Sequence, residues 1–149
     1  MSATPQTKAA LINALRLERE ALEQILQRLP AELLAEVMAQ SAIWTARAVT
    51  LLFQAGRSTN VQLPRCSAEA DAREVAAQRE RPLAHLQADF RAAHAQLLKR
   101  LEAWGDEAAL FNPRRFPSLR GQALADYIWS WVGVRDAECR ARLEKLVQP

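Results

Sequence analysis

The chain has 149 residues, of which half are hydrophobic, a quarter are charged and only 4 are glycine. This length fits one domain over residues 1–149 that buries roughly two-thirds of its unfolded surface, and so few glycines favour helices. The formal net charge is +3, from 20 basic and 17 acidic residues without a long block of one sign, a bias too weak to argue for nucleic acid, so we expect no nucleic-acid partner.

A first amphipathic helix is predicted from Thr4-Pro5 to Pro30. Thr4 would cap it, and Pro5 would occupy the first helical position, where its missing N–H costs nothing. Apolar residues then recur at threes, fours and sevens, namely Leu11, Leu15, Leu22, Ile25, Leu26 and Leu29. The next ten residues, AELLAEVMAQ, have high helix propensity and form either a short helix or a first turn of the following one.

The second long helix is predicted to begin at Trp44-Thr45, with Thr45 as its cap, and to close at Gly56. Trp44, Ala48, Leu51, Leu52 and Ala55 recur at helical spacing within it. Residues 57–66 lose this periodicity and hold Ser58, Asn60 and Pro64, which indicates a loop.

Ser67 is predicted to cap a shorter helix that runs to Arg79 and packs weakly, because its apolar residues are mostly alanine. Pro82 opens a third long helix that ends before Gly105. Its apolar seam alternates at threes and fours: Leu83, Leu86, Phe90, Ala93, Leu97, Leu101 and Trp104. A connector over residues 106–119 follows, in which Leu110, Phe111 and Phe116 are expected to be buried.

The stretch 118–147 carries the longest apolar stripe. At helical spacing one face holds Leu124, Ile128, Trp131, Arg135, Cys139, Arg142 and Leu146, with Tyr127, Val134, Glu138 and Leu143 beside it. A guanidinium and a thiol therefore interrupt a face that should meet a core, so they either reach the rim or line a polar cavity. Four long amphipathic helices predict an all-α four-helix bundle with a longer connection between the second and third.

Two cysteines, Cys66 and Cys139, lie in different contexts without metal-type spacing. The first ten residues lack the pattern of a secretory signal, and no apolar run reaches the ~20 residues that cross a bilayer. We therefore expect a cytoplasmic protein with free thiols and no membrane partner.

The residues that could carry chemistry are few. His85 falls on the polar face of the third helix and His94 beside its seam, and neither has a ligand partner at the right spacing, so we expect a solvated and a hydrogen-bonded residue. Arg135 has Glu138 and Cys139 one turn away; it would either bind an anion in a partly dry pocket or form a structural ion pair. Cys139 would need a lowered pKa to act as a nucleophile and is otherwise an inert thiol.

Aromatic residues crowd the same helix. Tyr127, Trp129 and Trp131 cannot all enter one core, so one exposed ring would mark a ligand or partner surface. Ordinary packing is the alternative, with Trp129 partly exposed.

Two stretches resemble a known family: Trp44-Thr45, and the run from Leu83 through NPRRFPSLRGQALADYI into the last helix. They are similar to the DinB-like superfamily of up-down-down-up four-helix bundles and, within it, to the ClbS/DfsB family. The resemblance covers nearly the whole chain in order, including the opening TPQTKAALINAL, and is strongest over residues 83–128.

The resemblance also bears on metal binding. Many DinB-like proteins hold a divalent metal with three histidines, at places that Leu52, Arg135 and Cys139 occupy in this chain. Leucine cannot coordinate a metal and arginine repels a cation, so the resemblance implies neither metal nor other cofactor. ClbS/DfsB members include metal-free proteins that protect a cell from a reactive small molecule by binding or hydrolysing it.

The leading expectation is a bundle that binds a small organic molecule between its helices. Arg135 would anchor an anionic or polar group, and the walls would be Trp131, Tyr127, Trp44, Cys139 and Leu52. One alternative is a metal-independent hydrolase in which Glu138, or a carboxylate elsewhere, activates water. The other is a bundle whose pocket is filled by side chains and which acts as a dimerising or interaction protein, for example as a homodimer; Leu52 in place of a polar ligand favours it.

Overall fold

The computed structural model describes residues 3–65 and 67–147, and that part of the chain is helical with no strand. This confirms the predicted all-α class. The order of elements is α1 (Lys8–Leu26), α2 (Ala31–Arg57), α3 (Ala68–Arg79), α4 (Leu83–Ala103), α5 (Glu107–Phe111), η1 (Pro117–Leu119), α6 (Leu124–Ile128), η2 (Trp129–Val134) and α7 (Arg135–Val147). The last three elements form one continuous helix in which η2 is a π-helical segment.

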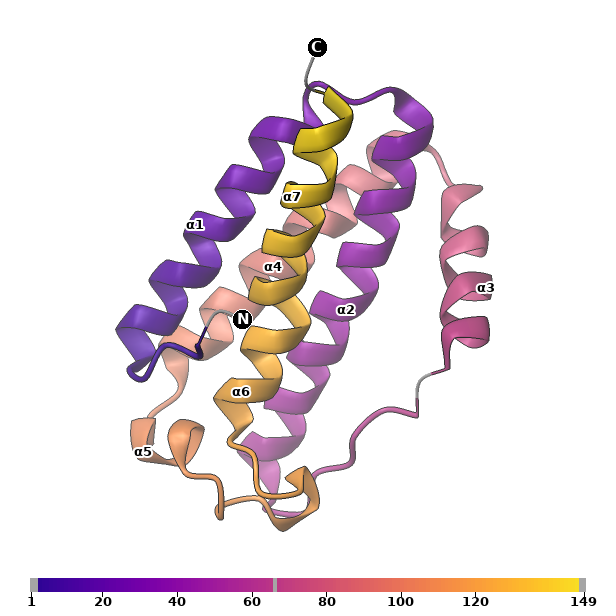
Figure 1. Ribbon diagram of the computed structural model, residues 1–149. Helices are drawn as coiled ribbons and strands as arrows, with labels where there is room; N and C mark the ends of the chain where they lie inside the picture. The colour runs from indigo at the N-terminus through magenta and orange to yellow at the C-terminus, as the bar shows by residue number, and fades with distance from the viewer. Residues whose placement is uncertain (1–2, 66, 148–149) are drawn as a thin grey trace.

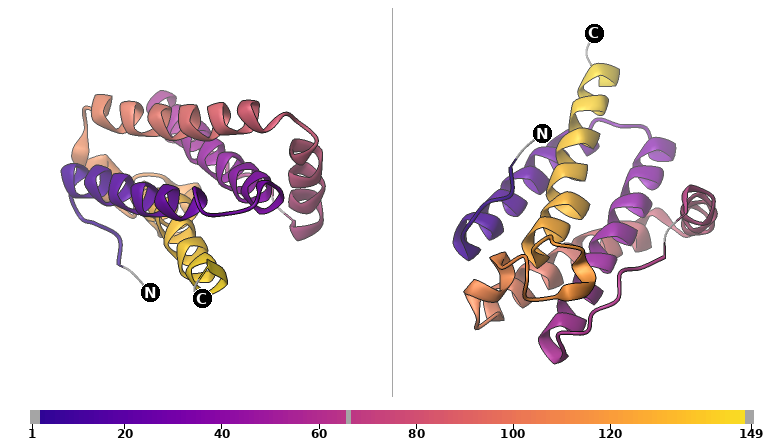
Figure 2. Two further views of the ribbon diagram at one scale, coloured as in Figure 1. Left: turned by 90° about the horizontal axis from the view of Figure 1, so that it is seen from above. Right: turned by 60° about the horizontal axis from the view of Figure 1, so that its bottom comes forward.

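The long helices lie side by side along one axis (Figure 1). The chain rises through α1, descends through α2, rises again through the short α3, descends through α4 and rises through α6, η2 and α7. Figure 2 shows that α3 stands beyond α2 and α4, at the edge of the assembly. Within the described residues, no helix is both long and apolar enough to span a membrane.

The first helix begins later than predicted. Thr7, and not Thr4, is its cap: Thr7 Oγ1 accepts a hydrogen bond from the Ala10 backbone N–H at 3.1 Å. A free N–H is thereby satisfied at the helix start, which is the usual role of such a cap. The helix ends at Leu26, and Pro30 then stands directly before α2.

The predicted helix start at Trp44-Thr45 is wrong, because α2 runs unbroken from Ala31 to Arg57. Thr45 lies in its middle, fully buried, and its hydroxyl donates to the Ser41 backbone carbonyl one turn earlier at 2.8 Å. A threonine inside a helix commonly makes this bond in place of capping. AELLAEVMAQ is therefore the first part of α2.

The middle of the chain follows the prediction closely. Ser67 caps α3 by accepting from the Ala70 N–H at 3.0 Å, and α3 ends at Arg79 with Val75 as its buried residue. Pro82 precedes α4. The connector is more ordered than expected, since Asp106 caps the short α5, while Leu110 and Phe116 are buried and Phe111 is half-buried.

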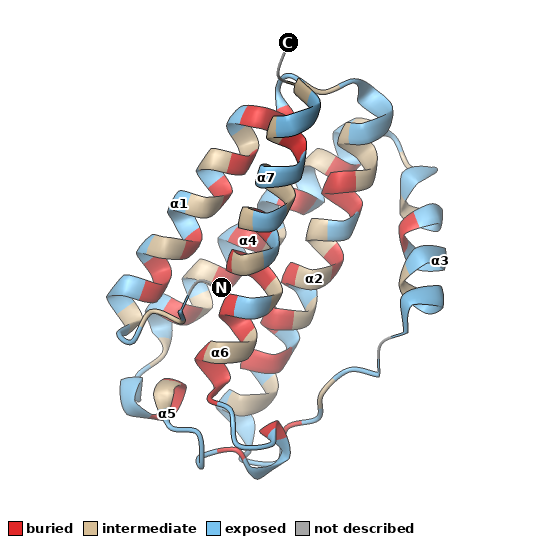
Figure 3. Cartoon of the chain, in the orientation of Figure 1, coloured by how far each residue is buried: buried red, intermediate tan, exposed pale blue. Residues whose placement is uncertain are grey.

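Most of the core lies in two apolar clusters placed one above the other along the helices, and a third, smaller cluster joins Val75 of α3 to Ala39 and Ile43 of α2. The lower cluster includes Leu15, Leu51, Leu97 and Ile128. The upper cluster includes Leu22, Met38, Phe90 and Leu143. Figure 3 shows that buried residues recur at intervals along α1, α2, α4 and α7 and alternate with exposed ones.

Candidate functional site

A layer of polar residues separates the two apolar clusters. Each long helix contributes one buried member: Arg19 from α1, Thr45 from α2, His94 from α4 and Asp136 from α7. We call these four residues the polar layer. Each lies in its helix between residues of the upper and the lower cluster.

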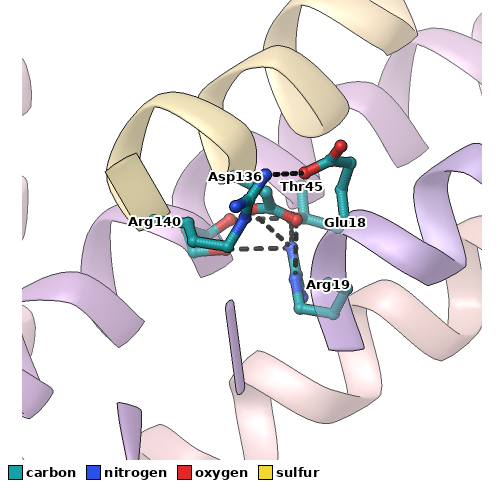
Figure 4. Close-up of polar contacts among 6 residues, drawn as sticks. Glu18, Arg19, Thr45, Asp136 and Arg140 are labelled. Carbon is teal, nitrogen blue, oxygen red and sulfur yellow. Dashed lines mark hydrogen bonds and ion pairs between the residues drawn. The ribbon is translucent and has the colours of Figure 1, made fainter. Parts of the chain in front are cut away.

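Arg19 is the centre of the polar layer (Figure 4). Its Nε donates to Asp136 Oδ2 at 2.8 Å, and its Nη2 donates to Thr45 Oγ1 at 3.2 Å and to Ser41 Oγ at 2.9 Å. The guanidinium carbon also lies 4.4 Å from the centre of the Phe90 ring. A buried charge needs such a set of partners, because removing it from water is costly.

The layer shifts the pKa values of two of its members. Burial raises the pKa of Asp136, and the positive charge of Arg19 opposes that shift. Burial, helped by the same positive charge, lowers the pKa of His94 to about 3, so this imidazole is neutral at pH 7. His94 was expected to be hydrogen-bonded at the edge of a seam; it is 8% exposed, and its Nε2 has no hydrogen-bond partner among the described residues.

A cavity of about 70 Å³ adjoins the polar layer between α2 and α7, and Ser41 and Asp136 belong to its wall. Five residues singled out from the sequence also line it: Trp44, Trp131, Arg135, Glu138 and Cys139. Tyr127 and Leu52 do not. The cavity therefore gathers most, but not all, of the residues expected to form a site.

The π-helical segment decides which residues of the last helix enter this region. Arg135 was expected to face inward, and this is wrong: Arg135 is exposed and Asp136 is buried. The wider π turn places an extra residue before Arg135, so the regular spacing from Leu124 and Ile128 no longer applies. Leu146, the last member of the predicted stripe, is 66% exposed.

Arg135 nevertheless remains at the cavity. Its guanidinium carbon lies 3.5 Å from the centre of the Trp44 ring, and that of Arg47 lies 4.5 Å from the same ring. Such cation–π contacts hold a guanidinium over an indole face. Arg135 is thus fixed at the mouth of the cavity by an aromatic partner.

A row of aromatic rings leads away from Trp44. Its centre is 5.8 Å from that of Trp131, and Trp131 meets Tyr127 edge-on at 5.5 Å. Tyr127 donates its hydroxyl to the Leu119 carbonyl at 3.0 Å, so it supports Trp131 from outside the cavity. Trp129, expected to be partly exposed, is buried.

Burial argues against a chemical role for two of the remaining candidate residues, Cys139 and Leu52. Cys139 is half-buried, and burial raises the pKa of its thiol against the opposing effect of Arg142. This disfavours the thiolate that a nucleophile requires. Leu52 lies in the lower apolar cluster, His85 is exposed, and Cys66, with any bridge to it, lies outside the described residues.

A groove of about 420 Å³ adjoins the cavity on the side of α3. The two hollows share Gln40, Trp44, Arg135 and Arg142, so these residues form their common border. Arg79 of α3 adds a third basic group to the groove, which also contains Glu36 and Asp71. The combined site has a polar base, an aromatic wall and a rim that carries both arginines and carboxylates.

Among residues 3–65 and 67–147, no three His, Cys, Asp or Glu side chains are grouped as a metal ion would require. No protein-family model, curated protein or solved structure matches this chain.

Proposed function

We propose that this chain is a metal-free four-helix bundle of the DinB-like type, close to the ClbS/DfsB branch, that binds a small organic molecule between α2 and α7. Binding would serve to sequester the molecule or to protect the cell from it. The order and direction of the long helices, with α3 inside the longer connection between α2 and α4, support the family part of the proposal.

One observation carries the binding part. Trp44 and Trp131, which come from different helices, meet above a cavity whose base includes a buried carboxylate and whose mouth holds Arg135. Ligand sites commonly combine apolar walls with a few fixed polar groups in this way. The cavity alone has room for about two water molecules at roughly 30 Å³ each, so the ligand would insert one group there and lie mainly in the adjoining groove.

The rim suggests the chemistry of the ligand. Three arginines, Arg79, Arg135 and Arg142, lie among three carboxylates, Glu36, Asp71 and Glu138, and Asp71 is already bound by Arg47 at 2.6 Å. Guanidinium groups bind carboxylates, sulfonates and phosphates through paired hydrogen bonds. A planar molecule with one anionic group therefore fits the Trp44 surface and the Arg135 guanidinium beside it.

Binding can be tested with the planar anionic dye 8-anilinonaphthalene-1-sulfonate, followed by its fluorescence. We expect Arg135→Gln to weaken the dye at least tenfold. Arg140→Gln is the matched control, because Arg140 is also on α7 but pairs with Glu18 and Glu144 and lines neither hollow. Equal affinities of wild type and Arg135→Gln would refute the proposed anchor, and native mass spectrometry would report any molecule that copurifies.

The small volume of the cavity favours a second candidate, a filled bundle that forms a homodimer. Leu52 supports it as well, since it is packed into an apolar cluster. Light scattering after gel filtration separates the candidates: a dimer with no dye binding favours the filled bundle. Turnover of a bound molecule that disappears in Glu138→Gln would instead favour the hydrolase.

A further inference from the structure

A third and larger hollow lies on the side of α3 opposite to the groove near Trp44. It has a volume of about 760 Å³ and is bounded by α2, α3, α4 and residues 62–65. That volume is within the range of sites for drug-sized molecules, roughly 300–1,000 Å³. We call it the α2–α4 groove.

Contacts beneath α3 separate this groove from the site near Trp44. Val75 packs with Ala39 and Ile43, and Arg47 pairs with Asp71 at 2.6 Å and with Glu74 at 3.7 Å. These contacts join α3 to α2 along its length. The two hollows therefore lie on opposite sides of α3, and Ile43 is their shared lining residue.

The floor of the α2–α4 groove is apolar. Alanines from both long helices, among them Ala42 and Ala93, leave the space open above the buried Ile43, Leu51 and Leu86, and the half-buried Leu63 adds apolar surface. Removing apolar ligand surface from water at such a floor is favourable by roughly 25 cal/mol per Å². A ligand would thus bind mainly through its apolar part.

Four of the five described charged residues that line the groove, all except Arg65, are paired within the protein. Arg47 is paired with Asp71 and Glu74, and Arg81 is paired with Asp89 at 2.6 Å. With Arg65, three basic groups on or beside the rim face three acidic ones. A charged group placed beside Arg47 or Arg81 would compete with these pairs, whereas a neutral ligand would leave them intact.

The polar groups that remain are amides and a hydroxyl. Gln62, Gln96 and Thr50 can each both donate and accept hydrogen bonds. Such groups suit neutral carbonyl, amide or hydroxyl functions. We infer that the α2–α4 groove is a separate binding site for an uncharged, mainly apolar organic molecule with hydrogen-bonding groups at its edge.

The neutral solvatochromic dye Nile red is a suitable probe, titrated against the full chain by fluorescence. Ala92 and Ala95 are both exposed on α4, but only Ala92 lines the groove. We expect Ala92→Trp to weaken Nile red at least tenfold and Ala95→Trp to change it less than twofold. Thr50→Trp fills the groove from α2 and should act like Ala92→Trp; circular dichroism establishes that each variant is folded.

The outcomes also separate this inference from the proposed function. Arg135→Gln should weaken binding of the anionic dye and leave Nile red binding unchanged. Ala92→Trp should weaken Nile red binding and leave binding of the anionic dye unchanged. If folded Ala92→Trp and Thr50→Trp both bind Nile red as wild type does, the groove site is refuted whatever the anionic dye does. If Arg135→Gln alone abolishes Nile red binding, the neutral dye uses the Trp44 site and the inference is wrong.

Discussion

Arg19 and Asp136 form a nearly inaccessible ion pair, with exposed side-chain fractions of 4% each. Pairs of this kind contribute little net stability when intact, because desolvation of the two charges offsets their attraction. Removing one partner is different, since the other charge is then buried alone. Loss of the buried Asp136, the partner of Arg19, should therefore cost far more folding free energy than loss of the more exposed Glu18, the partner of Arg140.

We predict that Asp136→Ala lowers the free energy of unfolding by about 3–5 kcal/mol, because the Arg19 guanidinium stays buried without its carboxylate. Urea denaturation followed by circular dichroism measures this. Glu18→Ala removes the partner of the more exposed Arg140 and should cost no more than about 1 kcal/mol. Similar losses in the two variants would contradict the role assigned to burial.

The sequence identifies single residues of the site better than it identifies their partners. Trp44, Trp131 and Cys139 could be chosen because of their helical spacing and unusual type. The link from Arg19 to Asp136 could not, because it joins residues 117 positions apart that carry no local signal. Asp136 also falls outside the apolar stripe unless the π turn is known.

At the scale of the element, local chemistry explains which helices were predictable. Ser67 and Pro82 stand at true starts, so α3 and α4 could be located closely. Thr45 has the same capping potential but bonds within its own helix, and only the neighbouring Arg19 shows why a buried hydroxyl belongs there. The π-helical segment could not be predicted from a regular 3.6-residue period.

Gly133 makes that π-helical segment compatible with Trp129. A Cβ atom on Gly133 would overlap the ring of Trp129, and this ring is buried. We predict that Gly133→Ala destabilises the protein by about 1–3 kcal/mol, although alanine has the higher helix propensity. Thermal and urea unfolding measure the effect.

Gly56 is the matched control. A Cβ atom there would meet its nearest neighbour, in Trp104, at an ordinary 3.8 Å, so Gly56→Ala should be neutral or stabilising by up to about 1 kcal/mol. A stable Gly133→Ala protein with an unchanged Trp129 environment would show that the segment tolerates a side chain.

The short helix α3 depends on few contacts, chiefly Val75 and the ion pairs of Arg47. We predict that Arg47→Ala speeds amide hydrogen exchange in α3 at least tenfold and leaves α4 unchanged. Arg16→Ala, which removes a surface pair with Glu102 on other helices, should not affect α3. Equal protection of α3 in both variants would mean that Val75 alone secures it.

For the whole molecule, the two hollows and the polar layer follow from one arrangement. Since α2 and α4 run in the same direction, the chain must return between them, and α3 occupies that return path (Figure 1). Its position beside α2 makes it a wall of both the groove near Trp44 and the α2–α4 groove.

Acid should destabilise the molecule through His94. Its pKa in the fold is about 3, below the ordinary 6.5, so the stabilising contribution is complete above about pH 6.5 and is lost as the pH falls toward 3. From pH 7 to pH 5 this amounts to about 2 kcal/mol in the free energy of unfolding. Denaturation of wild type and His94→Gln at both pH values measures it; the same loss in the variant would exclude His94 as the cause.

The polar layer also limits how the helices can slide past one another. Leucine-rich seams fit nearly as well after a shift of one turn, about 5.4 Å, so apolar packing alone discriminates weakly between vertical alignments. A one-turn shift of α1 would carry Arg19 into an apolar cluster and leave Asp136 alone. The four polar residues therefore select a single alignment of the helices along their axes. This alignment also fixes the position of the adjoining cavity relative to Trp44 and Trp131.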